Sequence, residues 1–395
     1  MDDYKIINNL LIRCTSQDKI CTIPETITCI DRGAFEGNSF IQNVKMPDLV
    51  EVVKPTAFCD CVNLETVVLS SKLTEIEYGL FKNCYKLKEI KGLENIKKIN
   101  NRAFSCCLCL TEFNIPEKVE YIDKQAFEKC KSLEKIIVDE NNDYYKSIDG
   151  VLYNKDLTKL IIYPTGKKDE TFVIPSFVKE IEDTAFEKNC YIKKIIFNDE
   201  IIKIPESCFQ GCDLLEEVIL NDNITQMGAY SFKNCKKLSK IDFSKSLKLI
   251  SSSTFENCIS LVNVILPNSL STLFDNVFNG CFNLKHVEFL GEINSLGREV
   301  FKNCVALEKV IFSKTCEQFG TNIFEGIEKE FIIEYNDSLE QWNELIKDRQ
   351  ICTHHPTIND FHYYGYSVDK YVPTIYEKET VISDKIKYKL ICNKK

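Results

Sequence analysis

The sequence contains little glycine, few histidines and no long hydrophobic run. There are 14 Gly and 4 His among 395 residues, and no glycine-rich phosphate-binding loop, nucleophile-elbow motif or His-Glu-x-x-His motif occurs. No apolar segment reaches the length of a membrane-spanning helix. The chain therefore lacks the sequence signatures of the common nucleotide-binding, hydrolytic and zinc-dependent enzymes. We expect no enzymatic activity, no catalytic residues, no cofactor and no membrane span.

The chain also lacks an excess of positive charge. Its formal net charge is −9 at pH 7, and Lys and Arg are interspersed with Asp and Glu. Binding to nucleic acid or to an anionic membrane requires a basic patch, and none is visible, so we expect no nucleic-acid partner. Residues 1–9 are acidic and polar, unlike a signal peptide. On sequence alone this indicates an intracellular protein, unless a leader has been removed.

What the sequence does contain is a phenylalanine that recurs every 23 residues. A fixed period of this length is typical of a solenoid, in which each repeat packs only on its neighbours. Such a fold grows in one dimension, so the chain length does not imply several globular domains. The phenylalanines form two sets: Phe35, Phe58, Phe81, Phe104 and Phe127, then Phe186, Phe209, Phe232, Phe255, Phe278, Phe301 and Phe324.

Further columns define each repeat when Phe is called position zero. Position plus three is mostly Cys, position plus six is Leu or Ile in every repeat except the last, which has Glu330, and positions plus nine and plus eleven are mostly apolar. The spacing Phe-x-x-Cys predicts a short helical or 3₁₀ turn. The pair at plus nine and plus eleven has the period of two that is typical of a half-buried strand. The expected fold is α/β: a right-handed solenoid with a parallel β-sheet on one side and short helical or 3₁₀ turns on the other.

Twenty cysteines raise the question of metal or redox chemistry. Side chains stacked in one column point the same way and cannot converge tetrahedrally on one ion, so we interpret the column as buried small apolar side chains. Column neighbours about 4.8 Å apart do not exclude disulfides by distance. Cys106 and Cys109 form one Cys-x-x-Cys, but it lies inside a repeat, in which Cys107 fills the column. His354, His355 and His362 cluster near the C-terminus, without an acidic or cysteine partner at ligand spacing. We expect no metal site.

Six segments are expected along the chain. Asp149-Gly150 and Asn154–Thr158 are turn sequences between apolar runs, which predict a hairpin. Residues Tyr4–Ile12 align with Tyr145–Tyr153, so we expect an N-terminal hairpin to cap the stack. The segments are 1–34 (hairpin cap and half repeat), 35–138 (first repeat array), 139–174 (hairpin insert), 175–337 (second array), 338–350 (capping helix with Ser338 as N-cap and the single Trp342) and 351–395 (aromatic-rich β tail).

These motifs resemble the BspA-like leucine-rich repeat family, with repeats of the Treponema type. Two close matches are Ala126-Phe127-Glu-Lys-Cys130-Lys-Ser-Leu133-Glu-Lys-Ile136 and the hairpin from Asp149 to Pro164. The resemblance covers roughly residues 20–345. It implies a non-enzymatic binding protein, often found on the surface of bacteria or protists, with adhesion to host proteins or cells. It therefore also implies a location at the cell surface or outside the cell.

The position ten residues after Phe lies between two buried strand positions and must face outward. A solvated face should be polar there, yet apolar residues recur in this column. Exposed apolar residues on one face of a solenoid are typical of a binding surface, although β-branched residues also favour strands for reasons unrelated to binding. The candidate partner-binding residues are Val68, Ile137, Ile196, Ile219, Ile265 and Ile311, with Lys91, Asn114, Asp242 and Glu288 between them.

The leading functional hypothesis is a scaffold that binds a protein partner through the strand face of the solenoid. The alternative is a cell-surface adhesin for host matrix or glycans, which clustered exposed aromatic residues would favour; the sequence shows such a cluster only in the tail 351–395. A third possibility is an enzyme whose chemistry resides in that tail, but a segment of this size is too small to fold alone without metal or disulfides.

Overall fold

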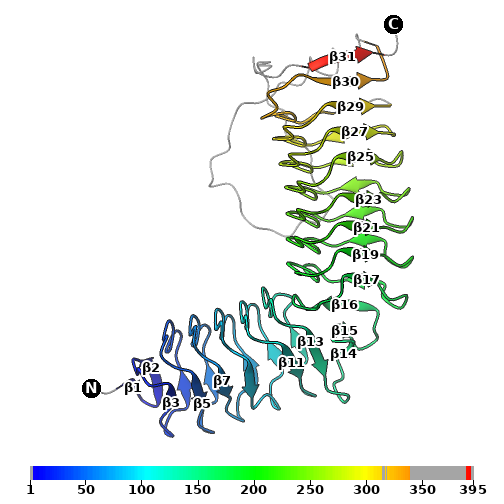
Figure 1. Cartoon of the computed structure of the whole chain (residues 1–395). Helices are drawn as coiled ribbons and strands as arrows, with labels where there is room; N and C mark the ends of the chain where they lie inside the picture. The colour runs from blue at the N-terminus through cyan, green and yellow to red at the C-terminus, as the bar shows by residue number, and fades with distance from the viewer. Residues whose placement is uncertain (1–2, 314–315, 317, 339–387, 393–395) are drawn as a thin grey trace. The chain divides into compact units, whose positions relative to one another are not determined.

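The structure, a computed structural model, describes residues 3–313, 316, 318–338 and 388–392 (Figure 1). These residues form β-strands and turns, without an α-helix. They belong to two compact units, Met1–Ser244 and Lys245–Lys395. Among the described residues there is accordingly no helix of the length and apolarity that crossing a membrane requires.

Each regular coil of the first unit contributes a longer and a shorter strand, which pair in parallel with the same strands of neighbouring coils. Residues 23 apart lie side by side, as Val44 and Val67 do. The longer strands carry positions plus eight to plus eleven: β3 (Ile20–Thr22), β5 (Asn43–Lys45), β7 (Thr66–Val68), β9 (Glu89–Lys91), β11 (Glu112–Ile115), β13 (Lys135–Val138), β17 (Thr171–Val173), β19 (Lys194–Ile196), β21 (Glu217–Ile219) and β23 (Lys240–Asp242). The shorter strands are β4 (Cys29–Ile30), β6 (Val52–Val53), β8 (Glu75–Ile76), β10 (Lys98–Ile99), β12 (Tyr121–Ile122), β18 (Glu180–Ile181), β20 (Lys203–Ile204) and β22 (Gln226–Met227).

The second unit repeats this arrangement. Its shorter strands β24 (Leu249–Ile250), β26 (Thr272–Leu273) and β28 (Ser295–Leu296) form one parallel ladder. Its longer strands β25 (Asn263–Leu266), β27 (His286–Phe289), β29 (Lys309–Phe312) and β30 (Phe331–Tyr335) form another, which β31 (Tyr388–Cys392) extends in parallel. The predicted solenoid with a parallel sheet, of the right-handed type expected for such crossovers, is confirmed.

The side of the coil that carries Phe is not helical, so the predicted helical or 3₁₀ turns are wrong. In nearly every coil the residues two before and two after Phe have left-handed backbone angles, as Thr56 (φ 60°) and Asp60 (φ 61°) do around Phe58. Positive φ cannot be accommodated in a right-handed helix. Successive backbone amides therefore bond alternately within the turn and to the next coil. The N–H of Cys59 donates to Thr56 O within the turn (3.0 Å), whereas the N–H of Phe58 donates to Leu80 O of the next coil (3.1 Å). The turn side is therefore a second hydrogen-bonded stack.

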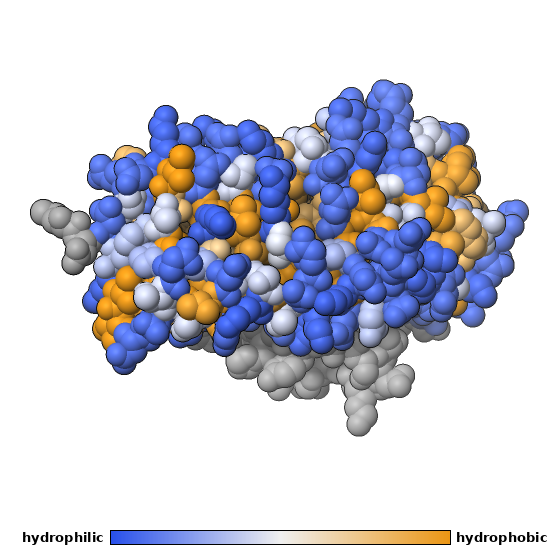
Figure 2. Space-filling view, turned by 90° about the horizontal axis from the view of Figure 1, so that it is seen from below, coloured by the Kyte–Doolittle hydropathy of each residue, from blue (hydrophilic) through white to orange (hydrophobic). Residues whose placement is uncertain are grey.

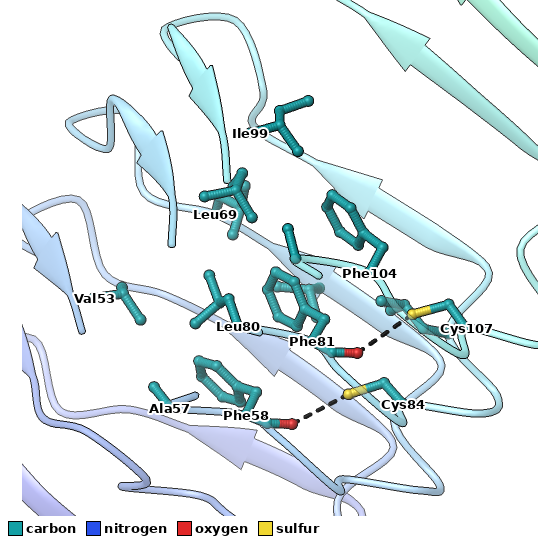
Figure 3. Close-up of a cluster of buried hydrophobic side chains, with 14 of the residues drawn as sticks. Val53, Ala57, Phe58, Leu69, Leu80, Phe81, Cys84, Ile99, Phe104 and Cys107 are labelled. Carbon is teal, nitrogen blue, oxygen red and sulfur yellow. Dashed lines mark hydrogen bonds between the residues drawn. The ribbon is translucent and has the colours of Figure 1, made fainter. Parts of the chain in front are cut away.

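The phenylalanines form a ladder of stacked rings in the core (Figure 3). The ring centroids lie 4.5 Å apart at Phe35–Phe58 and 5.8 Å apart at Phe278–Phe301. The ladder also includes a tyrosine that the Phe period does not identify. Tyr163 lies 23 residues before Phe186, and its ring stacks on that of Phe186 at 4.8 Å between centroids. Its amide bonds to Ala185 O, as the Phe amides do in other coils. The insert therefore supplies a coil of the same stack.

The column of cysteines is a hydrogen-bonded ladder as well as an apolar one. Eight of its thiols donate to the main-chain oxygen of the Phe in the preceding coil; Cys84 bonds to Phe58 O and Cys107 to Phe81 O (Figure 3). The same contact, at 3.0–3.3 Å, is made by Cys61, Cys84, Cys107, Cys130, Cys212, Cys235, Cys281 and Cys304. Burial raises the pKa of three of these thiols in particular, that of Cys304 to about 12 and those of Cys84 and Cys281 well above the ordinary value. They are neutral donors, and none of these eight cysteines forms a disulfide.

Asparagine replaces cysteine where the preceding coil is irregular. Asn189 donates to Pro164 O (3.1 Å) and to Thr165 O (3.2 Å), and its own side-chain oxygen accepts from the amides of Tyr191 and Ile192. A thiol has one weak donor and could not serve several backbone groups. Asn38, the first residue of the column, makes the equivalent bonds to Ser16 O, Phe40 N and Ile41 N.

Two hairpins interrupt the regular coils. They consist of β1 (Tyr4–Ile7) with β2 (Leu10–Cys14), and of β14 (Tyr145–Ile148), β15 (Val151–Asn154) and β16 (Lys159–Ile162). The predicted tight turn at Asp149-Gly150 is confirmed by positive φ at both residues. Tyr4–Ile12 and Tyr145–Tyr153 both form an antiparallel hairpin with positive φ at its two turn residues, as their alignment predicts, but the two hairpins join the ladder of shorter strands differently. At the N-terminus the second hairpin strand, β2, pairs in parallel with the shorter strand β4. In the insert the third strand, β16, makes the corresponding parallel pairing, with the shorter strand β18.

Most of the C-terminal predictions lie outside the described residues. These are the capping helix 338–350 beyond Ser338, Trp342, the three tail histidines and most of the tail 351–395. Within the tail, the predicted β-structure is present at β31 (Tyr388–Cys392).

Candidate protein-binding face

The candidate residues lie on the outer face of the longer strands. In β19, Ile195 is buried and Ile196 faces outward; in β21, Val218 and Ile219 do the same. This alternation follows from the pleat of a strand with one face in the core. Because residues 23 apart pair in register, Ile196 and Ile219 lie next to each other on adjacent coils.

Val173 extends this pair to a continuous apolar run of three. It pairs in register with Ile196, and 56% of its surface is exposed. Val173 is not among the residues predicted from the sequence, because the repeats are identified by Phe and this coil has Tyr163 in that position. Ile196 and Ile219 are half-buried. We call Val173, Ile196 and Ile219 the apolar run; Asp242 follows it in register.

The structure does not bring the other candidates into one stripe. Val68 lies between Lys45 and Lys91, and Ile137 pairs with Asn114. Ile137 is 42% exposed. In the second unit, Ile265 (59% exposed) and Ile311 pair on either side of Glu288. Figure 2 likewise shows hydrophobic patches separated by hydrophilic side chains on the face that it displays. Single apolar residues at a surface are common, so the apolar run is the most distinctive feature of the column.

A row of charged residues borders the apolar run, two positions before it on the same strands. Lys194 and Lys240 both pair with Glu217, at 2.8 and 2.5 Å. Hydrogen bonds from Lys194 and Lys240 lower the pKa of Glu217, so it is a carboxylate at neutral pH. An apolar centre with a polar, ion-paired edge is the anatomy of a protein interface.

A shallow hollow lies on the same face at the N-terminal coils. It has a volume of about 280 Å³ and is formed by β3, β5, β7 and the residues that follow them, including Glu25 and Pro47. Its outward-facing residues include Ile20, Thr22, Lys45 and Val68. Lys45 forms no ion pair with any described residue. Val68 is the one candidate residue that borders this hollow.

Within the part of the chain that the structure describes, one group of side chains could hold a metal ion: Glu36, Cys59 and Asp60, whose ligand atoms lie within 4.8 Å of one another. The chemistry of the thiol argues against it. Burial, followed by its hydrogen bond to Asp60 at 3.3 Å, raises the pKa of Cys59 to about 12. A metal ligand must be a thiolate, so a thiol that donates to a carboxylate is poorly prepared for this role. Asp60 is also engaged by the Asn83 amide at 2.7 Å.

Comparison with known proteins agrees with this architecture. The model of the BspA type leucine rich repeat region matches in six copies, over residues 5–134, 165–233 and 202–332. These ranges include both repeat arrays and omit most of the hairpin insert. A search of the curated proteins found no match.

Several solved structures are similar. The pneumococcal vaccine antigen PcpA is 25% identical, with a TM-score of 0.60 over 83% of this chain and 76% of that chain. A leucine-rich repeat protein from Eubacterium ventriosum is 27% identical, with a TM-score of 0.63 over 73% of this chain and 83% of that chain. A leucine rich cell surface protein from Faecalibacterium prausnitzii shares the fold at 24% identity, with a TM-score of 0.56 over 87% and 96%. From its repeat, its stacked core and these matches, the chain is a member of the BspA-type leucine-rich repeat family.

Proposed function

We propose that this protein is a non-enzymatic scaffold that binds a protein partner through the outer strand face of its solenoid, centred on Val173, Ile196 and Ile219. The observation that carries the proposal is the register of these three side chains. Adjacent coils place them next to one another, and no polar residue separates them. Val173 is the most exposed of the three. Covering them with a partner's apolar side chains would remove this surface from water.

The surroundings of the apolar run support the same proposal. Two of the three strands that carry it, β19 and β21, are paired on both sides, and β17, the first strand of this sheet, is paired with β19. The bordering Lys194–Glu217–Lys240 row is already held by ion pairs. A surface that does not need to reorganise loses less entropy on binding. The partner should therefore present a compact apolar patch with a polar border.

The proposal is tested by affinity capture from cell lysate and from cell-surface extracts, followed by mass spectrometry. The wild type is compared with the triple variant Val173→Lys, Ile196→Lys and Ile219→Lys. We expect a protein that the wild type retains and the variant loses. Circular dichroism and the thermal midpoint establish first that the variant is folded.

A matched control separates the face from general surface charge. Leu49, Tyr121 and Ile202 are also exposed apolar residues of the first unit, at 46%, 46% and 61%, but they lie outside the longer strands. Their triple replacement by Lys adds the same charge and should leave capture unchanged. Equal recovery with all three proteins, or recovery of no specific protein, would contradict the proposal.

A second candidate function is that of an adhesin for host matrix or glycans. Its support is the 25% identity to PcpA, a vaccine antigen, together with exposed tyrosines in the first unit. Tyr78, Tyr85 and Tyr144 are 41–50% exposed, and such rings can stack on sugars or on protein surfaces. Screening the wild type against arrayed glycans and matrix proteins tests this candidate. A hit that survives the Val173, Ile196 and Ile219 triple variant and is lost when these tyrosines are changed to Ala would favour it over the strand face.

A further inference from the structure

The first longer strand, β3, has one unpaired edge. It pairs with β5 on one side and is the terminal strand of the β3-β5-β7-β9 sheet. The N-terminal hairpin pairs instead with the shorter strands, through β2 and β4. The expected cap therefore covers one ladder and leaves the edge of the other unpaired within the described residues.

The backbone groups on this edge can be assigned from the ladder. Successive residues of a strand direct their N–H and C=O groups to opposite sides. Lys19 O accepts from Asn43 N at 3.0 Å, which turns the backbone groups of Lys19 and Cys21 toward β5. Those of Ile20 and Thr22 consequently point away from the sheet. The hydroxyl of Tyr4 confirms this direction, because it donates to Thr22 O at 2.9 Å.

Three backbone groups on this edge have no protein partner. Among the described residues, nothing bonds to Ile20 N, Ile20 O or Thr22 N. The strand is also accessible, since Ile20 is 69% exposed, the largest value among the large apolar residues of the described chain. Unpaired donors and acceptors on an exposed strand are a template for another strand.

The side chains beside the edge specify what that strand would carry. The hollow of about 280 Å³ continues from Ile20 and Thr22 across Lys45 to Val68. On the strand face of the first unit, Lys194 and Lys240 have carboxylate partners, whereas Lys45 has none among the described residues. An acidic side chain next to Lys45 would gain a charge-assisted hydrogen bond, and a β-branched residue would pack on Ile20.

We propose that the free edge of β3 binds an extended, acidic segment of a partner protein by adding it as a strand. The backbone of the segment pairs with Ile20 and Thr22, and its acidic side chain lies over the hollow against Lys45. Backbone pairing supplies affinity and the hollow supplies selectivity, as in other cases of strand addition. This site is separate from the apolar run and does not depend on it.

The test uses full-length protein and a phage library of random heptapeptides. We expect selection to enrich peptides that have Asp or Glu flanked by β-branched residues. A synthetic copy of the leading peptide should bind the wild type, and it should lose at least tenfold in affinity when alternate backbone amides are N-methylated. N-methylation removes donors from the peptide alone, so this arm does not depend on the folding of any variant.

Protein variants identify the edge and the cation. Thr22→Pro removes a donor that no described residue uses, at a place where an edge strand tolerates proline; it should abolish binding. Lys45→Glu should weaken binding at least tenfold, whereas Lys86→Glu, an equal charge change at an exposed lysine outside the hollow, should not. The Ile196→Lys and Ile219→Lys double variant should bind normally, which keeps this result independent of the proposed function.

Other outcomes overturn the proposal. They are the absence of enriched peptides, peptides that bind wild type and Thr22→Pro equally, and tolerance of N-methylation. A concentration-dependent wild-type dimer that Thr22→Pro abolishes would overturn it too, because the edge would then be occupied by a second copy of this chain.

Discussion

The thiol of Cys84 donates a hydrogen bond to the main-chain oxygen of Phe58, a residue of the preceding coil, at 3.1 Å. Both residues are fully buried. The repeat therefore uses cysteine because it combines the size of a small apolar side chain with one weak donor. This relationship accounts for the column of cysteines without metal or redox chemistry.

Replacing Cys84 by Ala should destabilise the first unit by about 1–3 kcal/mol, since it leaves a small cavity and removes the thiol bond to Phe58 O. The measurement is urea unfolding followed by circular dichroism. Tyr85→Ala, at the next and exposed position, is the control and should change stability by less than about 0.5 kcal/mol. A Cys84 variant as stable as the control would show that the ladder contributes nothing.

The stacked rings should contribute more than the thiols. Phe81 is buried and lies 5.6 Å from the rings of both Phe58 and Phe104. Phe81→Ala should cost about 3–5 kcal/mol, the range for a buried aromatic residue. Phe40 is 49% exposed, so Phe40→Ala provides a control of the same chemistry. Equal losses for the two variants, measured by urea unfolding, would mean that the ladder is not the core.

The hydroxyl of Tyr163, which the phenylalanines of the ladder lack, should contribute to stability. It donates to Asp169 at 2.8 Å, and Asp169 also pairs with the buried Lys167 at 3.2 Å. Tyr163→Phe removes a bond to a charged group and should cost about 1.5–3 kcal/mol in urea unfolding. Phe186→Tyr, the reverse change one coil away, should also be destabilising because it buries a hydroxyl among rings. A neutral Tyr163→Phe would show that the polar contact is dispensable.

The raised thiol pKa values predict how stability depends on pH. Burial raises the pKa of Cys304 from 9.0 to about 12. The unfolded chain therefore loses this proton at a lower pH than the folded chain. The stability that Cys304 contributes is complete below pH 9 and is lost as pH rises from 9 toward 12, at about 1.4 kcal/mol per pH unit. The stability difference between wild type and Cys304→Ala should shrink over this range in urea unfolding at pH 8, 9 and 10. A constant difference would contradict the assignment.

The fold could be predicted from the sequence to the extent that it depends on side-chain type. The Phe and Cys columns identify buried positions, because only repeated packing against a neighbouring coil keeps them at a period of 23. The turn conformation could not be predicted in the same way. Positive φ occurs at Thr56, Arg102 and Tyr230 as well as at glycines, so the hydrogen bonds between coils impose it and the residue type does not reveal it. Phe-x-x-Cys has helical spacing, but its backbone is not helical.

The sequence predicts which residues face outward on the strands, but it does not predict which of them lie next to one another. Position plus ten faces outward wherever a longer strand forms, so Ile196 and Ile219 were found from alternation alone. Val173 was missed because Tyr163 replaces Phe in its coil. Whether candidates touch depends on the residues between them in register, such as Glu288 between Ile265 and Ile311. The edge of β3 had no sequence signal, because it depends on which ladder the N-terminal hairpin joins.

The most direct test of the central claim is the affinity of the captured partner for three proteins, measured with purified components: the wild type, the Val173, Ile196 and Ile219 triple Lys variant, and the Leu49, Tyr121 and Ile202 triple Lys variant. Burial of an apolar centre predicts at least a tenfold loss for the first variant and less than a twofold change for the second. Equal affinities for all three proteins would show that the strand face of this solenoid is not its binding surface.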